Sequence, residues 1–179
     1  MKKFIVYFHG YNSSPETEKV KILKEAFPDD YVYCFQANVD PEIAQKTIEE
    51  KIDSALLDHM HENLQVIFIG TSLGGWLAAK FGNVYEVKTI LINPVYDPKE
   101  SLKKYGVSEE FRNKYDNLTI YSNYTFFFAN DDDVIDHSQL LIKLKQKNMG
   151  YFLHNGPKHQ YVEPHFTNNV IAFVKDIYG

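Results

Sequence analysis

Six short apolar runs, separated by longer amphipathic stretches, constrain the fold of this chain more than any other feature of its sequence. The runs are nearly continuous rather than alternating, which is typical of strands buried on both faces of a parallel sheet. They are Phe4–Phe8, Tyr31–Phe35, Gln65–Ile69, Lys88–Ile92, Thr125–Ala129 and Gly150–His154.

The stretches between these runs predict helices with one apolar side. They are Glu16–Phe27, Pro41–Met60, Leu73–Phe81, Asp136–Asn148 and a last helix that carries Phe166, Val170, Phe173, Val174 and Ile177. Asp40 is the expected N-cap of the second helix, and Gly82 is expected to end the third. The repeated strand–helix order predicts an α/β fold: a mostly parallel, doubly wound sheet of about six strands with helices on both faces.

One connection breaks this pattern. Residues 96–124 are rich in tyrosine and weakly periodic, with short helices predicted at Pro98–Tyr105 and Ser108–Tyr115. A connection of this length is usually functional or disordered. We expect residues 1–179 to form a single domain in which 96–124 is a small helical insert over the functional site. A plain cover over the sheet is the alternative.

Charge and composition exclude several classes of protein. The net charge of the 179 residues is −5 and no run of Lys and Arg occurs, so nucleic acid is not an expected partner. Cys34 is the single cysteine, so no disulfide can form within the chain, and it is interpreted as a small buried apolar residue. Phe4–Phe8 is too short for a secretion signal and no run is long enough to span a membrane. A cytoplasmic location follows as the expectation.

Residues 70–74 read Gly-Thr-Ser-Leu-Gly, between a predicted strand and a predicted helix. In that context G-x-S-x-G is typical of a sharp turn that raises a serine hydroxyl above the sheet. The strand and helix pass so closely that side chains at Gly70 and Gly74 would collide, and Gly75 adds further room. We interpret Ser72 as a nucleophile; a helix N-cap serine is the alternative.

A serine nucleophile of this kind is followed along the chain by an acid and then a histidine. Residues 130–136 read Asn-Asp-Asp-Asp-Val-Ile-Asp, directly after the fifth apolar run. We choose Asp132, because Val134 and Ile135 can anchor its loop in the core. Asp131 and Asp133 remain open as alternatives, and a helix cap is expected at Asp136.

His159 is the candidate base among seven histidines. It follows the last predicted strand, and Gly156 and Pro157 mark a turn that can present it at the carboxyl edge of the sheet. His154 and His165 are the alternatives. Three further histidines are placed elsewhere: His59 and His61 at the opposite edge of the sheet, and His137 exposed at the start of a helix.

Attack by serine on an acyl carbon leaves negative charge on oxygen, which backbone N–H groups can stabilise. We expect one donor to be the N–H of Leu73, at a helix N-terminus, and the other to be the N–H of Tyr11, in the loop after the first strand. Gly10 permits the turn of that loop, and His9 is expected to brace it rather than to transfer protons.

These motifs together resemble a known family. They are Phe8-His9-Gly10-Tyr11-Asn12-Ser13-Ser14-Pro15, Gly70-Thr71-Ser72-Leu73-Gly74-Gly75, Leu91-Ile92-Asn93-Pro94 and the segment from Asp132 to His159. In order and spacing they are similar to the YqiA/YcfP-like small bacterial esterases of the α/β-hydrolase superfamily, over most of the chain except the insert. The resemblance implies a minimal α/β-hydrolase fold and esterase activity on short acyl esters, extending to acyl-CoA thioesters.

The leading hypothesis is a serine hydrolase that cleaves carboxylic esters of short acyl chains through an acyl-enzyme. The runner-up is an acyl-CoA thioesterase, and a hydrolase-fold binding module without activity is a third. A nucleotide-binding domain is disfavoured, because the glycines lack both the Walker lysine and the G-x-G-x-x-G spacing. No cofactor and no metal are expected, since His59-x-His61 alone is a weak metal pattern.

Overall fold

A computed structural model describes residues 1–178. Within them a parallel sheet has the strand order β2-β1-β3-β4-β5-β6. Its strands are β1 Lys2–Phe8, β2 Tyr31–Cys34, β3 Leu64–Thr71, β4 Lys88–Ile92, β5 Tyr124–Ala129 and β6 Phe152–His154. The predicted α/β fold is confirmed. The last strand is shorter than expected and the third is longer.

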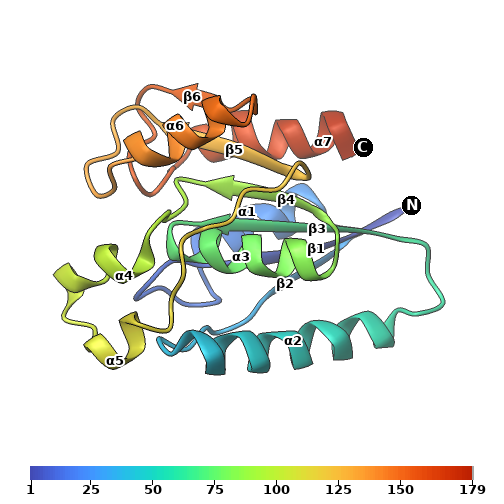
Figure 1. Cartoon of the computed structure of the whole chain (residues 1–179). Helices are drawn as coiled ribbons and strands as arrows, with labels where there is room; N and C mark the ends of the chain where they lie inside the picture. Colours follow the sequence, from blue (N-terminus) through green and yellow to red (C-terminus); the bar gives the residue numbers. More distant parts are fainter. Residues whose placement is uncertain (179) are drawn as a thin grey trace.

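Helices cover both faces of the sheet (Figure 1). They are α1 Glu18–Ala26, α2 Pro41–Asp58, α3 Leu73–Val84, α6 Ser138–Gln146, the π-helical turn η2 Phe166–Ile171 and α7 Ala172–Tyr178. Helices α2, α3 and α6 pack on one face, while α1, η2 and α7 pack on the other. The side chains of β1 alternate between these two cores, with Val6 in the first and Ile5 in the second.

Two helix ends differ from the expectation. Helix α3 continues through Gly82, because this glycine packs on β4: an added Cβ would lie 2.0 Å from the Thr89 hydroxyl oxygen. Helix α6 begins at Ser138 rather than at Asp136, whose carboxylate accepts hydrogen bonds from the Ser138 N–H and hydroxyl. The Asp40 cap of α2 is confirmed, since its carboxylate accepts from the Glu42 N–H at 3.0 Å.

Two apolar positions are packed less tightly than expected. Ile177 lies in α7, but 60% of it is exposed to solvent. Cys34 is only partly buried at the edge strand β2, where it packs against the second core. Burial raises the pKa of the Cys34 thiol to about 12, which keeps it protonated and fits a packing role.

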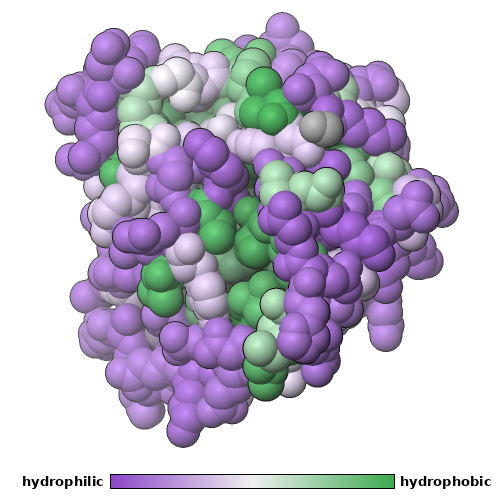
Figure 2. Space-filling view, turned by 90° about the vertical axis from the view of Figure 1, so that its right-hand side faces the viewer, coloured by the Kyte–Doolittle hydropathy of each residue, from purple (hydrophilic) through white to green (hydrophobic). Residues whose placement is uncertain are grey.

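The connection between β4 and β5 holds short helices: α4 Pro98–Ser101, the 3₁₀ turn η1 Lys103–Tyr105 and α5 Glu109–Arg112. They are shorter than the two predicted helices but lie in the same places. In Figure 1 α4 and α5 lie at the left, at the end of the sheet where the strands terminate. Figure 2 views the opposite end, where hydrophobic side chains gather within a mostly hydrophilic surround.

Candidate active site

Ser72 occupies a sharp turn between β3 and α3. Its φ is 59° and its ψ is −124°, a backbone conformation that residues other than glycine rarely adopt. Such strain costs about 1–3 kcal/mol and persists only where neighbouring contacts enforce it. Here the Ser72 N–H donates to Ile92, and its carbonyl accepts from Gly75 and Val95. The backbone is therefore held in the strained turn from both sides.

The glycines around Ser72 are required by close packing. A Cβ at Gly70 would lie 2.2 Å from the Gly74 carbonyl oxygen, and one at Gly74 would lie 2.1 Å from the Phe8 carbonyl oxygen. At Gly75 a Cβ would come within 2.8 Å of Pro94. The close approach predicted from the pentapeptide is therefore present, and it involves strand β1 as well as helix α3.

The side chains of Ser72, His159 and Asp132 form one chain of hydrogen bonds. His159 Nε2 lies 3.1 Å from Ser72 Oγ, and His159 Nδ1 lies 2.9 Å from Asp132 Oδ2. The side chains of His159 and Asp132 are 8% and 2% exposed. With Nδ1–H directed at the carboxylate, Nε2 is left to accept the serine proton.

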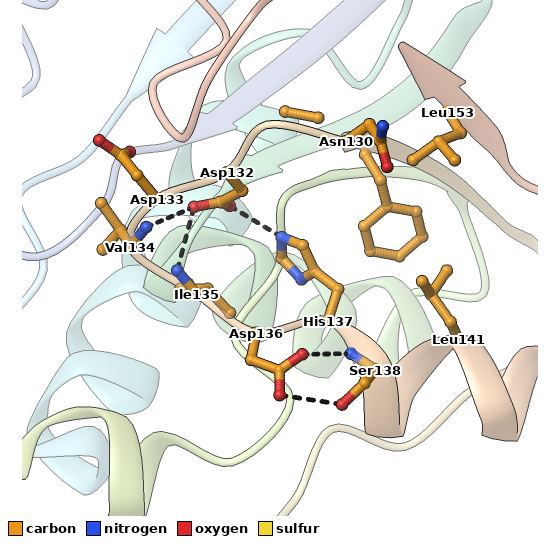
Figure 3. Close-up of a pocket in the computed structure, with 12 residues that line it drawn as sticks. Asn130, Asp132, Asp133, Val134, Ile135, Asp136, His137, Ser138, Leu141 and Leu153 are labelled. Carbon is orange, nitrogen blue, oxygen red and sulfur yellow. Dashed lines mark hydrogen bonds and ion pairs between the residues drawn. The ribbon is translucent and has the colours of Figure 1, made fainter. Parts of the chain in front are cut away.

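Asp132 is the one aspartate of its run that reaches this histidine. Its Oδ1 accepts from the N–H groups of Val134 and Ile135, at 2.8 and 3.0 Å (Figure 3). Asp131 instead accepts from the N–H groups of Gly156 and Lys158, at 3.1 and 3.2 Å. Asp133 is exposed. Of these three aspartates, Asp132 is the one whose carboxylate contacts His159.

His137 was predicted to be exposed, and this prediction is wrong. Its side chain is 8% exposed, and its Nε2 donates to Asp132 Oδ2 at 2.8 Å (Figure 3). The loop 130–137 wraps around Asp132, which turns the histidine inward before α6 begins. Burial alone would raise the pKa of Asp132, but the hydrogen bonds from His137, His159 and the two backbone N–H groups hold it well below its usual range.

Asn93, directly after β4, ties the site together. Its side chain is completely buried; Nδ2 donates to the carbonyls of Lys158 and His159 at 3.0 and 2.9 Å, and Oδ1 accepts from the Ala129 N–H at 2.8 Å. It therefore links the histidine loop to the end of β5, just before the acid loop. The sequence contained a signal for this residue, because Asn93 follows a strand at the catalytic edge, but no role was assigned to it.

The alternative histidines, His154 and His165, contact other residues of the C-terminal segment. His154 Nδ1 accepts from the buried Tyr161 hydroxyl at 2.6 Å, and Asn169 donates to the same hydroxyl at 3.3 Å. Burial raises the pKa of Tyr161 to about 12. His165 lies beside Gly156, where an added Cβ would be 3.1 Å from its Nε2. None of these contacts involves Ser72.

His9 braces the loop after β1. Its Nδ1–H donates to the Gly10 carbonyl at 2.8 Å, and its Nε2 accepts from the Ala37 N–H at 3.5 Å. Burial lowers the pKa of His9, although the bond to Gly10 acts in the opposite direction. A neutral ring satisfies both bonds, which fits bracing. Gly10 approaches Ser72 closely, since a Cβ there would lie 3.4 Å from the serine Cβ.

A cavity of about 350 Å³ opens at Ser72. Tyr11 and Leu73, the residues predicted to supply oxyanion donors, both line it with Ser72 and His159. Leu73 is the first residue of α3, where backbone N–H groups have no acceptor within the helix. From the insert, Ser101, Leu102, Lys104 and Tyr105 also line the cavity, whereas Phe111 and Tyr121 do not.

Comparison with known proteins shows the family. Residues 4–126 match the profile of a family described as uncharacterised protein family UPF0227. The chain belongs to this family. UPF0227 proteins of Pectobacterium atrosepticum and Serratia proteamaculans are 24% identical to it, over 99 and 110 residues. These matches cover 55% and 60% of this chain and 54% and 60% of the relatives, so the chain spans little more than half their length.

Solved structures show the same fold over nearly the whole UPF0227 chain. A Pyrococcus furiosus esterase has a TM-score of 0.72 at 14% identity, covering 99% of this chain and 82% of that one. A soluble variant of Saccharomyces cerevisiae monoglyceride lipase has a TM-score of 0.73 at 12% identity, with coverages of 98% and 85%. A Bacillus cereus carboxylesterase has a TM-score of 0.61 at 17% identity, covering 99% of this chain and 87% of that one. The profile match thus shows the family, and these structures show the α/β-hydrolase fold.

Two further findings concern the described residues. Among residues 1–178, no helix combines the length and the apolar character that crossing a membrane requires. Within the same range, no group of three or more His, Cys, Asp or Glu side chains is arranged to hold a metal ion.

Proposed function

We propose that this UPF0227 protein is a serine hydrolase that cleaves carboxylic esters of short acyl chains. The observation that carries the proposal is the continuous hydrogen-bond chain from Ser72 Oγ through His159 to Asp132. The strained backbone of Ser72 supports it, because strain of this kind is typical of a nucleophile on a strand–helix turn.

In the proposed reaction Ser72 Oγ attacks the ester carbonyl carbon while His159 Nε2 takes the hydroxyl proton. Asp132 holds the imidazole in the required tautomer and stabilises the imidazolium. The backbone N–H groups of Tyr11 and Leu73 donate hydrogen bonds that stabilise the negative charge developing on the carbonyl oxygen. The imidazolium then protonates the leaving alcohol, and a water molecule, deprotonated by His159, hydrolyses the acyl-enzyme.

The size of the cavity supports a short acyl chain. About 350 Å³ is near the lower end of the range for small-molecule sites. Tyr11 and Tyr105 both line it, with ring centroids 5.2 Å apart. Because η1 and the loop after β1 contribute these rings, we propose that the insert 96–124 sets the accepted chain length.

The experiment is a panel of p-nitrophenyl esters of increasing acyl length, with acyl-CoA thioesters of the same acids, for the wild type and Ser72→Ala. We expect the highest kcat/KM for short esters and a loss of at least about 10³-fold in kcat for Ser72→Ala. Higher kcat/KM for the thioesters would assign the protein to the runner-up class. A variant that keeps more than about a tenth of the activity would remove Ser72 from its proposed role.

A further inference from the structure

The cavity at Ser72 carries an unusual charge distribution. Among the residues of 1–178 that line it, none is Asp or Glu, and Lys104 is the only Lys or Arg. The remaining polar walls near the serine are uncharged, such as Asn12, Ser13 and Gln160. A protein with a net charge of −5 therefore presents a single lysine to this site.

Lys104 is an exposed residue of η1 whose side chain reaches across to the acid loop. Its Nζ donates to the carbonyl of Val134, in the acid loop, at 2.7 Å. The same Nζ lies 5.1 Å from the centroid of the Tyr105 ring, which also lines the cavity. An ammonium group has three N–H donors. The Val134 carbonyl takes one of them, so further donors are available to a ligand.

The partner of Lys104 differs from that of neighbouring lysines. Lys103 forms an ion pair with Glu100 at 2.6 Å, and Lys114 pairs with Glu42 at 3.0 Å. In the described part of the chain, no carboxylate oxygen lies within 4.0 Å of Lys104 Nζ. Asp97, Glu100 and Asp136 line an adjoining cavity that Lys104 also borders and that Ser72 does not line.

From this arrangement we infer that the substrate carries a carboxylate, a few atoms from the ester carbonyl, which Lys104 binds. This inference rests on the proposed function, whose substrate class it narrows to esters with one negative charge. A single lysine matches the charge of a carboxylate, whereas a phosphate monoester carries about −1.5 to −2 at neutral pH and commonly engages several donors. The carboxylate takes no part in bond making or breaking; it orients the carbonyl toward Ser72.

The test uses two pairs of stable alkyl esters. Monomethyl and dimethyl glutarate place the carboxylate, or its neutral methyl ester, on the acyl side of the scissile bond. 4-Acetoxybutanoate and its methyl ester place it on the alcohol side. Hydrolysis is followed by chromatography of the products, which identifies the ester bond that is cleaved, in the wild type, Lys104→Met, Lys104→Arg and Lys103→Met. Lys103→Met is the matched control, because Lys103 is adjacent but does not line the cavity.

We expect the wild type to favour the anionic member of at least one pair by about tenfold in kcat/KM, the effect of one hydrogen bond to a charged group. Lys104→Met should lose this preference, so that kcat/KM becomes about equal for the anionic and the neutral member of each pair. Lys104→Arg should keep the preference, and Lys103→Met should behave as the wild type. The pair that responds tells on which side of the ester the carboxylate lies.

Binding separates this inference from the proposed function. Calorimetric titration of the Ser72→Ala protein with the same esters should show tighter binding of an anionic member, and Lys104→Met in that background should abolish the difference. The inference would be overturned if kcat/KM and the dissociation constant were the same for the anionic and the neutral members. It would also be overturned if the preference for the anionic member survived in Lys104→Met. Anion binding without hydrolysis of any of the four esters would support the subsite and count against the hydrolase proposal.

Discussion

His137 Nε2 lies 2.8 Å from Asp132 Oδ2, the same oxygen that accepts from His159 Nδ1 at 2.9 Å. One carboxylate oxygen thus joins two histidines, of which only His159 reaches Ser72. Because His137 does not line the cavity at Ser72, it acts on the reaction through the position and charge of Asp132. His137 is a positioning residue in this account.

Replacing His137 by Leu is expected to lower kcat by about 10- to 100-fold, since hydrogen bonds to charged groups contribute ~1.5–3 kcal/mol. KM should change little. His137→Gln keeps an N–H donor in a similar place and should restore most of kcat. Identical kinetics for the Leu and Gln variants would show that the hydrogen bond has no role.

Asn93→Ala is expected to lower both stability and activity. It leaves the Ala129 N–H and the His159 carbonyl without their buried partner, at about 1–3 kcal/mol for each group. Urea unfolding should therefore show a loss of about 2–6 kcal/mol in the free energy of unfolding, and kcat should fall because the histidine loop is no longer tied to β4. The exposed Asn117→Ala is the control and should match the wild type. An unchanged midpoint for Asn93→Ala would refute the role of this residue.

Gly74→Ala tests the close approach of α3 to β1. The added methyl group would lie 2.1 Å from the Phe8 carbonyl oxygen, which is backbone and cannot rotate away. We expect the free energy of unfolding to fall by about 1–3 kcal/mol or more, despite the higher helix propensity of alanine. Gly150→Ala is the control, because nothing lies within 4 Å of a Cβ there. Thermal melts compare the two, and equal melting temperatures would contradict the packing argument.

The burial of His9 predicts a dependence of stability on pH. Its pKa in the folded protein is lowered, so between the unfolded value of about 6.5 and the folded value the unfolded chain binds more protons. The free energy of unfolding should therefore fall as the pH drops from 7 to 5. Urea titrations at each pH should show a smaller fall for His9→Asn. His154, whose pKa is also lowered by burial, leaves a residual slope. A steeper slope in the variant would contradict the assignment.

The sequence was sufficient for the sheet and for the places of the main groups. Continuous apolar runs mark strands buried on both faces, and the carboxyl ends of parallel strands lie together, so Ser72, Asp132 and His159 could be expected at one edge. The C-terminal end of α3 was predicted too early, because Gly82 packs against Thr89, a tertiary contact without a local signal.

The roles of His137 and Asn93 required the structure. A histidine at the start of a helix is usually exposed, and only the path of residues 130–137 around Asp132 buries His137. Asn93 donates to the carbonyls of Lys158 and His159, which lie 65 and 66 positions further along the chain. No spacing rule in the sequence indicates contacts at that separation. The proposed role of Lys104 likewise depends on the cavity that it lines, which the sequence does not reveal.

Whether His159 and Asp132 activate Ser72 is measured by the rate at which a fluorophosphonate labels the protein, followed by intact mass and peptide mapping. We expect one adduct, on Ser72, in the wild type and in Asp133→Asn, because residue 133 is exposed. In Asp132→Asn the same adduct should form more slowly by up to about 10⁴-fold, because the imidazole loses its tautomer and its counter-charge. An unlabelled wild type, or labelling of Asp132→Asn at the wild-type rate, would contradict the account.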